Sequence, residues 1–203
     1  HEIRTPMSLI ISPLQKLIST DKDGERQKNY HTIYRNAERI LRLVNQLMDI
    51  RKIDKGQMSL KFQEIDIVGF IRDLYYTFEY QANAKHITLC FQTEMENLQA
   101  WIDPKNFDKV ILNIISNAFK FTPSEGHITL RVSTVSQAEC ELLPNFPSQY
   151  NSILVEGKYL FIEVIDTGKG ISDQEAEKIF EPFYRSQEDI HRQISGTGIG
   201  LSL

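Results

Sequence analysis

The sequence Ile-Glu-Val-Ile-Asp-Thr-Gly-Lys-Gly at residues 162–170 passes from an apolar, β-branched segment into a turn that contains two glycines. A run of this kind, bounded by aspartate and glycine, is typical of a strand followed by a tight turn, so we expect a strand that leads into Asp166. An ionised carboxylate at that place could accept a hydrogen bond from an exocyclic amine such as adenine N6. Because Asp and Gly follow many strands, the motif alone also fits an ordinary turn.

Mixed α/β patterning surrounds this segment from residue 56 onward. Alternating or β-branched runs predict strands over residues 58–62, 87–91, 100–102, 127–135 and 159–165. Helices are predicted over residues 67–85 and 104–121. Asp66 is expected to cap the first of these helices, and Asp103-Pro104 to begin the second. Residues 136–158 are expected to form a hairpin tip or a surface insertion.

The first 50 residues have a different, purely helical pattern. Apolar side chains at alternating spacings of three and four fall at Ile3, Met7, Ile10, Leu14 and Leu17, and again at Ile33, Ala37, Ile40, Val44 and Leu47. Turn residues at 21–24 separate these stripes, so we expect an antiparallel helical hairpin. A lone hairpin leaves much of its stripe in water, which favours dimerisation into a four-helix bundle, although docking on the rest of the chain could cover part of it.

Composition narrows the function classes. Of the 203 residues, 41% are hydrophobic and 25% charged, which describes a globular chain with enough apolar material for a core. A net charge of -4 gives no general attraction for nucleic acid. Cys90 and Cys140 match no zinc or redox spacing, and no apolar run is long enough to span a membrane. The chain starts without methionine, and we expect it to be a fragment of a longer protein.

Two amide side chains share one face of the predicted helix over residues 104–121. Asn113 and Asn117 lie four residues apart, and Lys120 follows nearly one turn later. Buried amides are costly without partners, and an asparagine oxygen suits a hard cation such as Mg²⁺ that is shared with phosphates. Capping of nearby backbone or exposure to solvent would explain the pair equally well.

A second glycine-rich stretch, Gly-Thr-Gly-Ile-Gly-Leu, occupies residues 196–201. It looks like a loop that enters a helix, where free backbone N–H groups favour an anion. It resembles the Rossmann motif only superficially, because no first strand precedes it. The polar residues 184–195 fit either a mobile cover over a bound nucleotide or an ordinary surface loop.

Five short motifs, taken in order, resemble those of two-component sensor histidine kinases. They are an H box at residues 1–6 (His-Glu-Ile-Arg-Thr-Pro), an N box at 113–122, a first glycine box at 166–170, an F box at 180–183 and a second glycine box at 196–201. Five motifs in family order over nearly the whole chain make the resemblance specific, although each motif is short. The amino-acid sequence at residues 45–49 and 117–123 is similar to that of kinase cores of hybrid sensors from Bacteroides-like bacteria.

The resemblance implies an α+β architecture in two domains. Residues 1–55 would form a dimerisation and histidine phosphotransfer domain, a helical hairpin that makes a four-helix bundle with a second copy. Residues 56–203 would form a catalytic ATP-binding domain, a GHKL (Bergerat) α/β sandwich with a mixed sheet packed on helices, without the family's closing helix and strand. The implied function is ATP-dependent autophosphorylation, followed by transfer to an aspartate of a response-regulator receiver domain, with phosphatase activity as an option.

The resemblance also implies catalytic roles. His1 would accept the phosphoryl group, and Glu2 would orient its imidazole and take up its proton. A neutral imidazole is a competent nucleophile near neutral pH because its pKa lies near 6.5. Thr5 would position water for dephosphorylating the partner. Arg185 would reach the γ-phosphate.

Nucleotide and metal contacts are implied in the same way. Asn117 would ligate Mg²⁺, and Asp166 would read adenine. Asn113 and Lys120 would lie near the phosphates, and Phe121 would line the pocket. The remaining nucleotide-binding residues are Gly168, Gly170, Phe183, Gly196, Gly198, Gly200 and Leu201.

ATP and Mg²⁺ are the implied cofactors, and the implied partners are a second copy and a receiver domain, in a separate protein or in the same full-length chain. We expect this segment to contact neither nucleic acid nor membrane, and to be the cytoplasmic portion of a membrane-anchored bacterial sensor.

One alternative function is a GHKL ATPase without a phosphoacceptor, against which the His1-Glu2 pair argues. The other is a degenerate, non-catalytic dimerisation module, against which the intact Asn117 and Asp166 argue.

Overall fold

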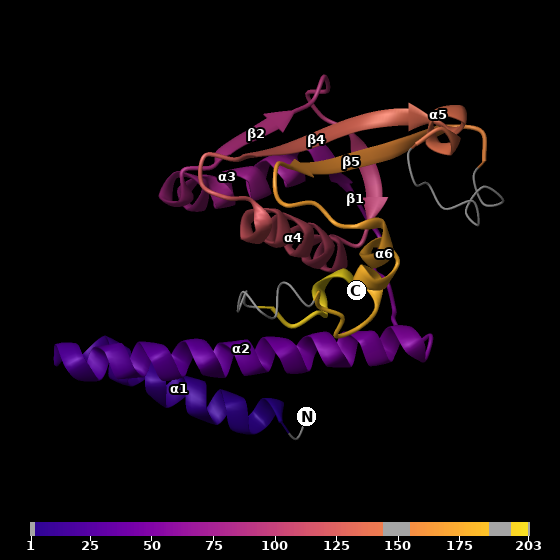
Figure 1. Cartoon of the computed structure of the whole chain (residues 1–203). Helices are drawn as coiled ribbons and strands as arrows, with labels where there is room; N and C mark the ends of the chain where they lie inside the picture. The colour runs from indigo at the N-terminus through magenta and orange to yellow at the C-terminus, as the bar shows by residue number, and fades with distance from the viewer. Residues whose placement is uncertain (1–2, 144–154, 187–195, 203) are drawn as a thin grey trace. The chain divides into compact units, whose positions relative to one another are not determined.

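The computed structural model describes residues 3–143, 155–186 and 196–202. The chain falls into two compact units (Figure 1). The first unit contains residues up to Ser59 together with Asp173–Leu203, and the second contains Leu60–Ser172. No helix in the described ranges is long and apolar enough to cross a lipid bilayer.

An antiparallel helical hairpin makes up most of the first unit, as the apolar stripes predict. Helix α1 spans Arg4–Thr20 and helix α2 spans Gly24–Asp54, and the two lie alongside each other (Figure 1). Met7, Leu14 and Ala37 are buried, so only part of each stripe is covered. Residues that belong to the same stripes remain 39–54% exposed; they are Ile3, Ile10, Leu17, Ile33, Ile40 and Leu47.

The turn between α1 and α2 is held by Asp21. Its Oδ1 accepts a hydrogen bond from Arg26 Nη2 at 3.0 Å. Its Oδ2 accepts from Tyr30 Oη at 3.0 Å and lies 2.8 Å from Arg26 Nε. The backbone N–H of Asp23 donates to the same carboxylate. These groups, above all Arg26, lower the pKa of Asp21 to about 2 because they stabilise its charged form.

The C-terminus of α2 ends in a turn that requires glycine. Gly56 has φ +61°, its N–H donates to the carbonyl of Ile53, and the N–H of Gln57 donates to the carbonyl of Lys52. This pair of bonds is the Schellman arrangement, in which a left-handed residue closes the helix and satisfies its last carbonyls. The helical pattern therefore stops where the sequence changes to mixed α/β patterning.

The second unit contains a three-stranded mixed sheet and a separate two-stranded one. The strands are β1 (Gln63–Asp66), β2 (Thr88–Gln92), β3 (Gln99–Ile102), β4 (His127–Ser136) and β5 (Lys158–Asp166). β4 is the central strand, parallel to β2 and antiparallel to β5, while β1 pairs with β3 in antiparallel fashion. The expected fold, a mixed sheet packed on helices, is confirmed.

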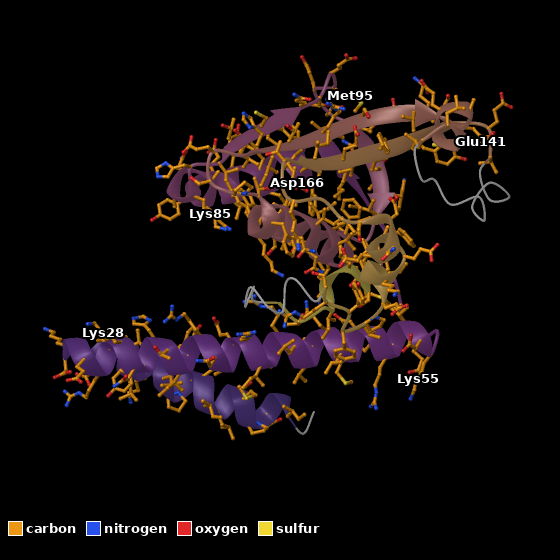
Figure 2. The ribbon with its side chains drawn as sticks, viewed as in Figure 1. Lys28, Lys55, Lys85, Met95, Glu141 and Asp166 are labelled. Carbon is orange, nitrogen blue, oxygen red and sulfur yellow. The ribbon has the colours of Figure 1, made fainter. Side chains whose placement is uncertain are left out.

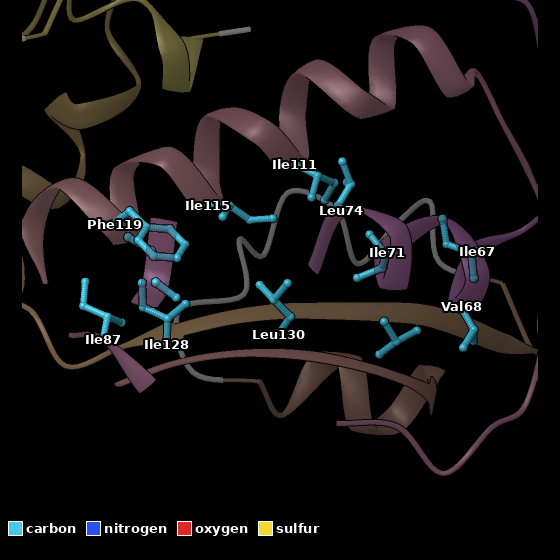
Figure 3. Packing of buried hydrophobic residues seen from close by; sticks show 13 residues of the cluster. Ile67, Val68, Ile71, Leu74, Ile87, Ile111, Ile115, Phe119, Ile128 and Leu130 are labelled. Carbon is cyan, nitrogen blue, oxygen red and sulfur yellow. The ribbon is translucent and has the colours of Figure 1, made fainter. Parts of the chain in front are cut away.

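Two helices pack on one face of the mixed sheet and form the core with it. Helix α3 spans Ile67–Lys85 and helix α4 spans Pro104–Phe121. The inward side chains of β4 alternate with exposed or half-buried ones, as the two-residue period of a strand requires. Figure 3 shows the fully buried members of this core, among them Ile71, Ile115, Phe119, Ile128 and Leu130.

The helix starts were predicted correctly. Asp66 caps α3 by accepting from Val68 N, and it also accepts from Leu98 N, the main cause of its lowered pKa. Asp103 caps α4 by accepting from Asn106 N at 3.0 Å, with Pro104 in the first helical turn.

The strand predicted over residues 58–62 is wrong, because pairing with β3 begins only at Gln63. Between β4 and β5 lies a short helix, α5 (Gln137–Glu141), within the expected hairpin connection. Ser136 and Glu139 form its capping box, a signal that was present in the sequence. Residues 144–154 of this connection lie outside the described residues.

Candidate functional site

The C-terminal half of α4 carries the first group of predicted site residues. Asn113 and Asn117 are half-buried on the helix, and Lys120 and Phe121 occupy its last turn. The Lys120 ammonium lies over the Phe121 ring, 4.4 Å from the ring centroid. A cation at this distance is attracted by the negative face of the ring, so the two side chains hold one another in place.

Asp166 is the last residue of β5, where it pairs with Ile128 of β4, and its side chain is exposed (Figure 2). One carboxylate oxygen, Oδ1, accepts a hydrogen bond from Gly168 N at 2.8 Å. This bond orients the carboxylate in the turn after the strand. The strand end with an oriented carboxylate is the geometry that the sequence predicts.

Gly168 brings the turn after β5 against the end of α4. A Cβ atom at this position would lie 2.6 Å from Asp166 Oδ1 and 2.8 Å from the backbone oxygen of Phe121. Only glycine leaves room for both contacts. Gly170 is needed for a different reason, since its φ of +71° is left-handed and its Cβ would meet open space.

Packing behind this turn fixes Asp166 further. Thr167 Oγ1 accepts a hydrogen bond from His127 N at 2.9 Å. The neighbouring Gly126 has no room for a Cβ, which would collide with the Thr122 methyl group and lie 3.0 Å from Thr167 Oγ1. The ends of α4 and β5 and the start of β4 are therefore joined around Gly126.

The F box and the second glycine box belong to the first unit, where they contact each other. Helix α6 (Asp173–Ala176) and the 3₁₀ turns η2 (Lys178–Phe180) and η3 (Gly200–Ser202) lie in this region. Phe183 N donates to the carbonyl of Gly198 at 2.7 Å, and both residues have left-handed backbones, with φ of +69° and +68°. A Cβ on Gly198 would lie 2.5 Å from the backbone oxygen of Tyr184. Gly198 is thus required by a backbone contact within the protein itself.

The other predicted residues of this unit can be placed singly. Arg185, Gly196 and Leu201 are half-buried, and Gly200 begins η3. Phe183 is 59% exposed, although its backbone is fixed. Thr5 is exposed in the first turn of α1. His1 and Glu2, and most of the segment predicted as a cover, lie outside the described residues.

The donor set determines what kind of metal could bind. In the part of the chain that the structure describes, no group of three or more His, Cys, Asp or Glu side chains could hold a metal ion. Asn117 supplies a neutral amide oxygen. Such a donor suits a Mg²⁺ ion that keeps several waters and takes its remaining ligands from phosphates.

One residue beside this site was not singled out in the sequence. Lys169 lies between the two glycines of the turn, and its ammonium is 5.5 Å from the centroid of the Phe121 ring. A lysine inside the glycine box was a visible signal. Its approach to Phe121 depends on how Gly168 packs, which sequence spacing does not reveal.

The chain matches two known protein families. Residues 102–203 match the histidine kinase-, DNA gyrase B- and HSP90-like ATPases, and residues 1–56 match the His Kinase A (phospho-acceptor) domain. The chain is 34% identical to Histidine kinase P4 of Formosa agariphila over its whole length, and it spans 14% of that relative.

Solved structures agree with the fold. Full-length ShkA in complex with AMPPNP has a TM-score of 0.75 at 23% identity, covering 100% of this chain and 37% of ShkA. Histidine kinase ThkA in complex with response regulator protein TrrA has a TM-score of 0.52 at 24% identity, covering 91% of this chain and 48% of that one. With a phospho-acceptor domain followed by the matching ATPase domain, the chain belongs to the histidine kinase family.

Proposed function

We propose that this chain is the catalytic core of an ATP-dependent protein histidine kinase, which phosphorylates His1 and then passes the phosphoryl group to an aspartate of a receiver domain. The observation that carries the proposal is the close packing of Gly168 between the Asp166 carboxylate and the Phe121 backbone. This packing brings the end of the N box and the first glycine box together. The match to both kinase domains supports the same function.

The α/β unit supplies the proposed adenine and phosphate contacts. The second carboxylate oxygen of Asp166 is proposed to accept a hydrogen bond from adenine N6, because Oδ1 already accepts from Gly168. Phe121 is proposed to line the base pocket, with Asn113 and Lys120 near the phosphates. Asn117 would hold a Mg²⁺ ion, which neutralises phosphate charge when bound.

For the transfer step, the proposed nucleophile is a nitrogen of the neutral His1 imidazole. The bond between this nitrogen and the γ-phosphorus forms as the bond to the β,γ-bridging oxygen breaks, and ADP leaves. Glu2 takes up the imidazole proton. Arg185 is proposed to stabilise the charge on the γ-phosphate, and Phe183, Gly196, Gly198, Gly200 and Leu201 stay predicted nucleotide contacts.

A second copy and a receiver domain are the proposed partners. The exposed apolar stripes of α1 and α2 fit a four-helix bundle between two copies. The ThkA structure contains a response regulator, which supports a receiver partner for this chain, in a separate protein or in the same full-length chain. The proposed domain boundary lies between residues 1–55 and 56–203. Thr5 is proposed to act in phosphatase activity toward the receiver domain. The proposed location is the cytoplasmic portion of a membrane-anchored sensor.

The decisive experiment incubates the full-length protein with ATP labelled at its γ-phosphate. We expect label on the protein that is lost in acid and stable in base, as a phosphoramidate should be. The His1→Gln variant should lose it, while His31→Gln, which changes an exposed histidine of α2, should keep it. Label that persists in His1→Gln would remove His1 from the mechanism. Release of free phosphate without labelled protein would instead favour the GHKL ATPase alternative.

A further inference from the structure

Two lysine ammonium groups lie over one aromatic ring at the candidate site. Lys120 Nζ is 4.4 Å from the Phe121 ring centroid, and Lys169 Nζ is 5.5 Å from the same centroid. Both distances are within the range in which a ring attracts a cation, about 6 Å. The two lysines come from different elements, one from the last turn of α4 and the other from the turn after β5.

The backbone explains why Lys169 reaches this ring. Because Gly168 has no side chain, the turn after β5 can pack closely against the backbone of Phe121. A Cβ atom on residue 168 would lie only 2.8 Å from the Phe121 backbone oxygen. Gly170 then takes the left-handed conformation, with φ +71°, and turns the chain away. Lys169 is held between these two glycines, so its starting point beside Phe121 is set by the turn itself.

The charge arrangement favours an anion with several negative groups. The two ammonium groups lie 4.4 Å and 5.5 Å from the same ring centroid, so they cannot be farther apart than these two distances together. This separation does not exceed the Debye length, which is roughly 10 Å at 0.1 M salt. Salt screens charges at this separation only partly. A polyphosphate within reach of both ammonium groups would therefore be attracted to each of them.

We propose that Lys169 is a second phosphate-binding cation of the nucleotide site, acting with Lys120 on the polyphosphate chain of a nucleoside di- or triphosphate. The inference rests on the proposed function, since it needs a nucleotide whose base lies between Phe121 and Asp166. It adds a residue that contacts the phosphates but not the base.

The test compares binding of ATP, ADP and adenosine by titration calorimetry in the wild type, Lys169→Gln and Lys158→Gln. Lys158 is an exposed lysine at the opposite end of β5 from Asp166, so its variant is the matched control. Lys169→Gln should weaken ATP and ADP by about tenfold, the usual effect of losing one hydrogen bond to a charged group. Adenosine affinity should not change, and Lys169→Arg should bind ADP as the wild type does.

Salt dependence gives a second readout. The dependence of ADP affinity on salt concentration should be weaker in Lys169→Gln than in the wild type, because one fewer cation faces the phosphates. Unchanged ADP affinity in Lys169→Gln would overturn the proposal. Equal losses for adenosine and ADP would also overturn it, since Lys169 would then act through the shape of the base pocket. A wild type that binds none of the three ligands would defeat the proposed function itself, an outcome distinct from these two.

Discussion

At the residue scale, two threonines beside Gly126 differ in how their hydroxyl groups are satisfied. Thr167 Oγ1 accepts a hydrogen bond from His127 N at 2.9 Å. Thr122 is 6% exposed, and its Oγ1 has no hydrogen-bond partner among the described residues. A buried hydroxyl without a partner costs stability, because it has lost its bonds to water. The same side chain is therefore unfavourable at one position and favourable at the other.

Replacing each threonine by the nearly isosteric valine should give opposite results. Thr122→Val should raise the free energy of unfolding by about 1 kcal/mol, because the unpaired hydroxyl is removed. Thr167→Val should lower it by a similar amount, since the His127 N–H loses its acceptor. Urea denaturation followed by circular dichroism measures both. A loss of stability in Thr122→Val would show that its hydroxyl has a partner, such as a buried water.

Sequence reasoning identified some residues of the candidate site and overlooked others for a physical reason. Asp166 was predicted because a strand end is visible in the local pattern, and its position at the end of β5 is confirmed. Lys169 was missed because its closeness to Phe121 depends on a contact between segments 48 residues apart in the chain, made possible by the missing side chain of Gly168. Local periodicity carries no information about such contacts.

At the scale of elements, local signals located the helices better than the strands. Capping by Asp66 and Asp103 is local, so the starts of α3 and α4 were predicted correctly. The strand prediction over residues 58–62 failed because a strand also needs a partner. The next pair along β1 and β3 would place Phe62 opposite Asp103, but Asp103 caps α4, and its carboxylate accepts from Lys61 N at 2.8 Å. The ladder therefore ends at Gln63.

The Asp21 turn should make the hairpin sensitive to acid. The pKa of Asp21 is lowered from 3.8 to about 2, chiefly by the hydrogen bond from Arg26. Its contribution to stability is present above the unfolded value and is lost as the pH falls through the folded one. We therefore expect the thermal midpoint of the hairpin to fall between about pH 3.8 and pH 2.

Matched variants isolate this effect from general acid denaturation. In Asp21→Asn, the stability deficit relative to the wild type should be largest at neutral pH and should shrink through the same pH window. Tyr30→Phe removes only one of the hydrogen bonds, so its deficit should be smaller. Thermal melting at a series of pH values, followed by circular dichroism, provides the measurement. A deficit independent of pH would show that Asp21 acts through packing instead of charge.

At the scale of the whole molecule, the hairpin presents apolar residues that its own fold does not bury. Ile3, Ile10 and Leu17 recur at every seventh position of α1, and Ile33, Ile40 and Leu47 do the same on α2. Heptad recurrence of exposed apolar residues is typical of helices that pack against other helices. Two hairpins that pack these apolar stripes against each other would bury them in one four-helix bundle.

A single charge in the stripe should separate the two copies. Ile40 is 46% exposed, so Ile40→Glu should leave the hairpin folded, yet place a carboxylate in the proposed bundle core. The two lost isoleucines and the two buried charges should weaken dimerisation by at least about a hundredfold. Sedimentation equilibrium gives the dissociation constant. Leu142→Glu, at a side chain 82% exposed after α5, is the control and should dimerise as the wild type does.

The long ladder between β4 and β5 has a practical use. Pairing runs without a break from Ile128 opposite Asp166 to Ser136 opposite Lys158, so the register is set along nine residue pairs and not by the hairpin end. Sliding by one position would turn Val164 and Ile162 out of the core. Peptide tags or fluorescent reporters grafted just after Glu141 should therefore leave the carboxylate at the far end of β5 undisturbed, which makes this hairpin a convenient attachment point for following the kinase core in living cells.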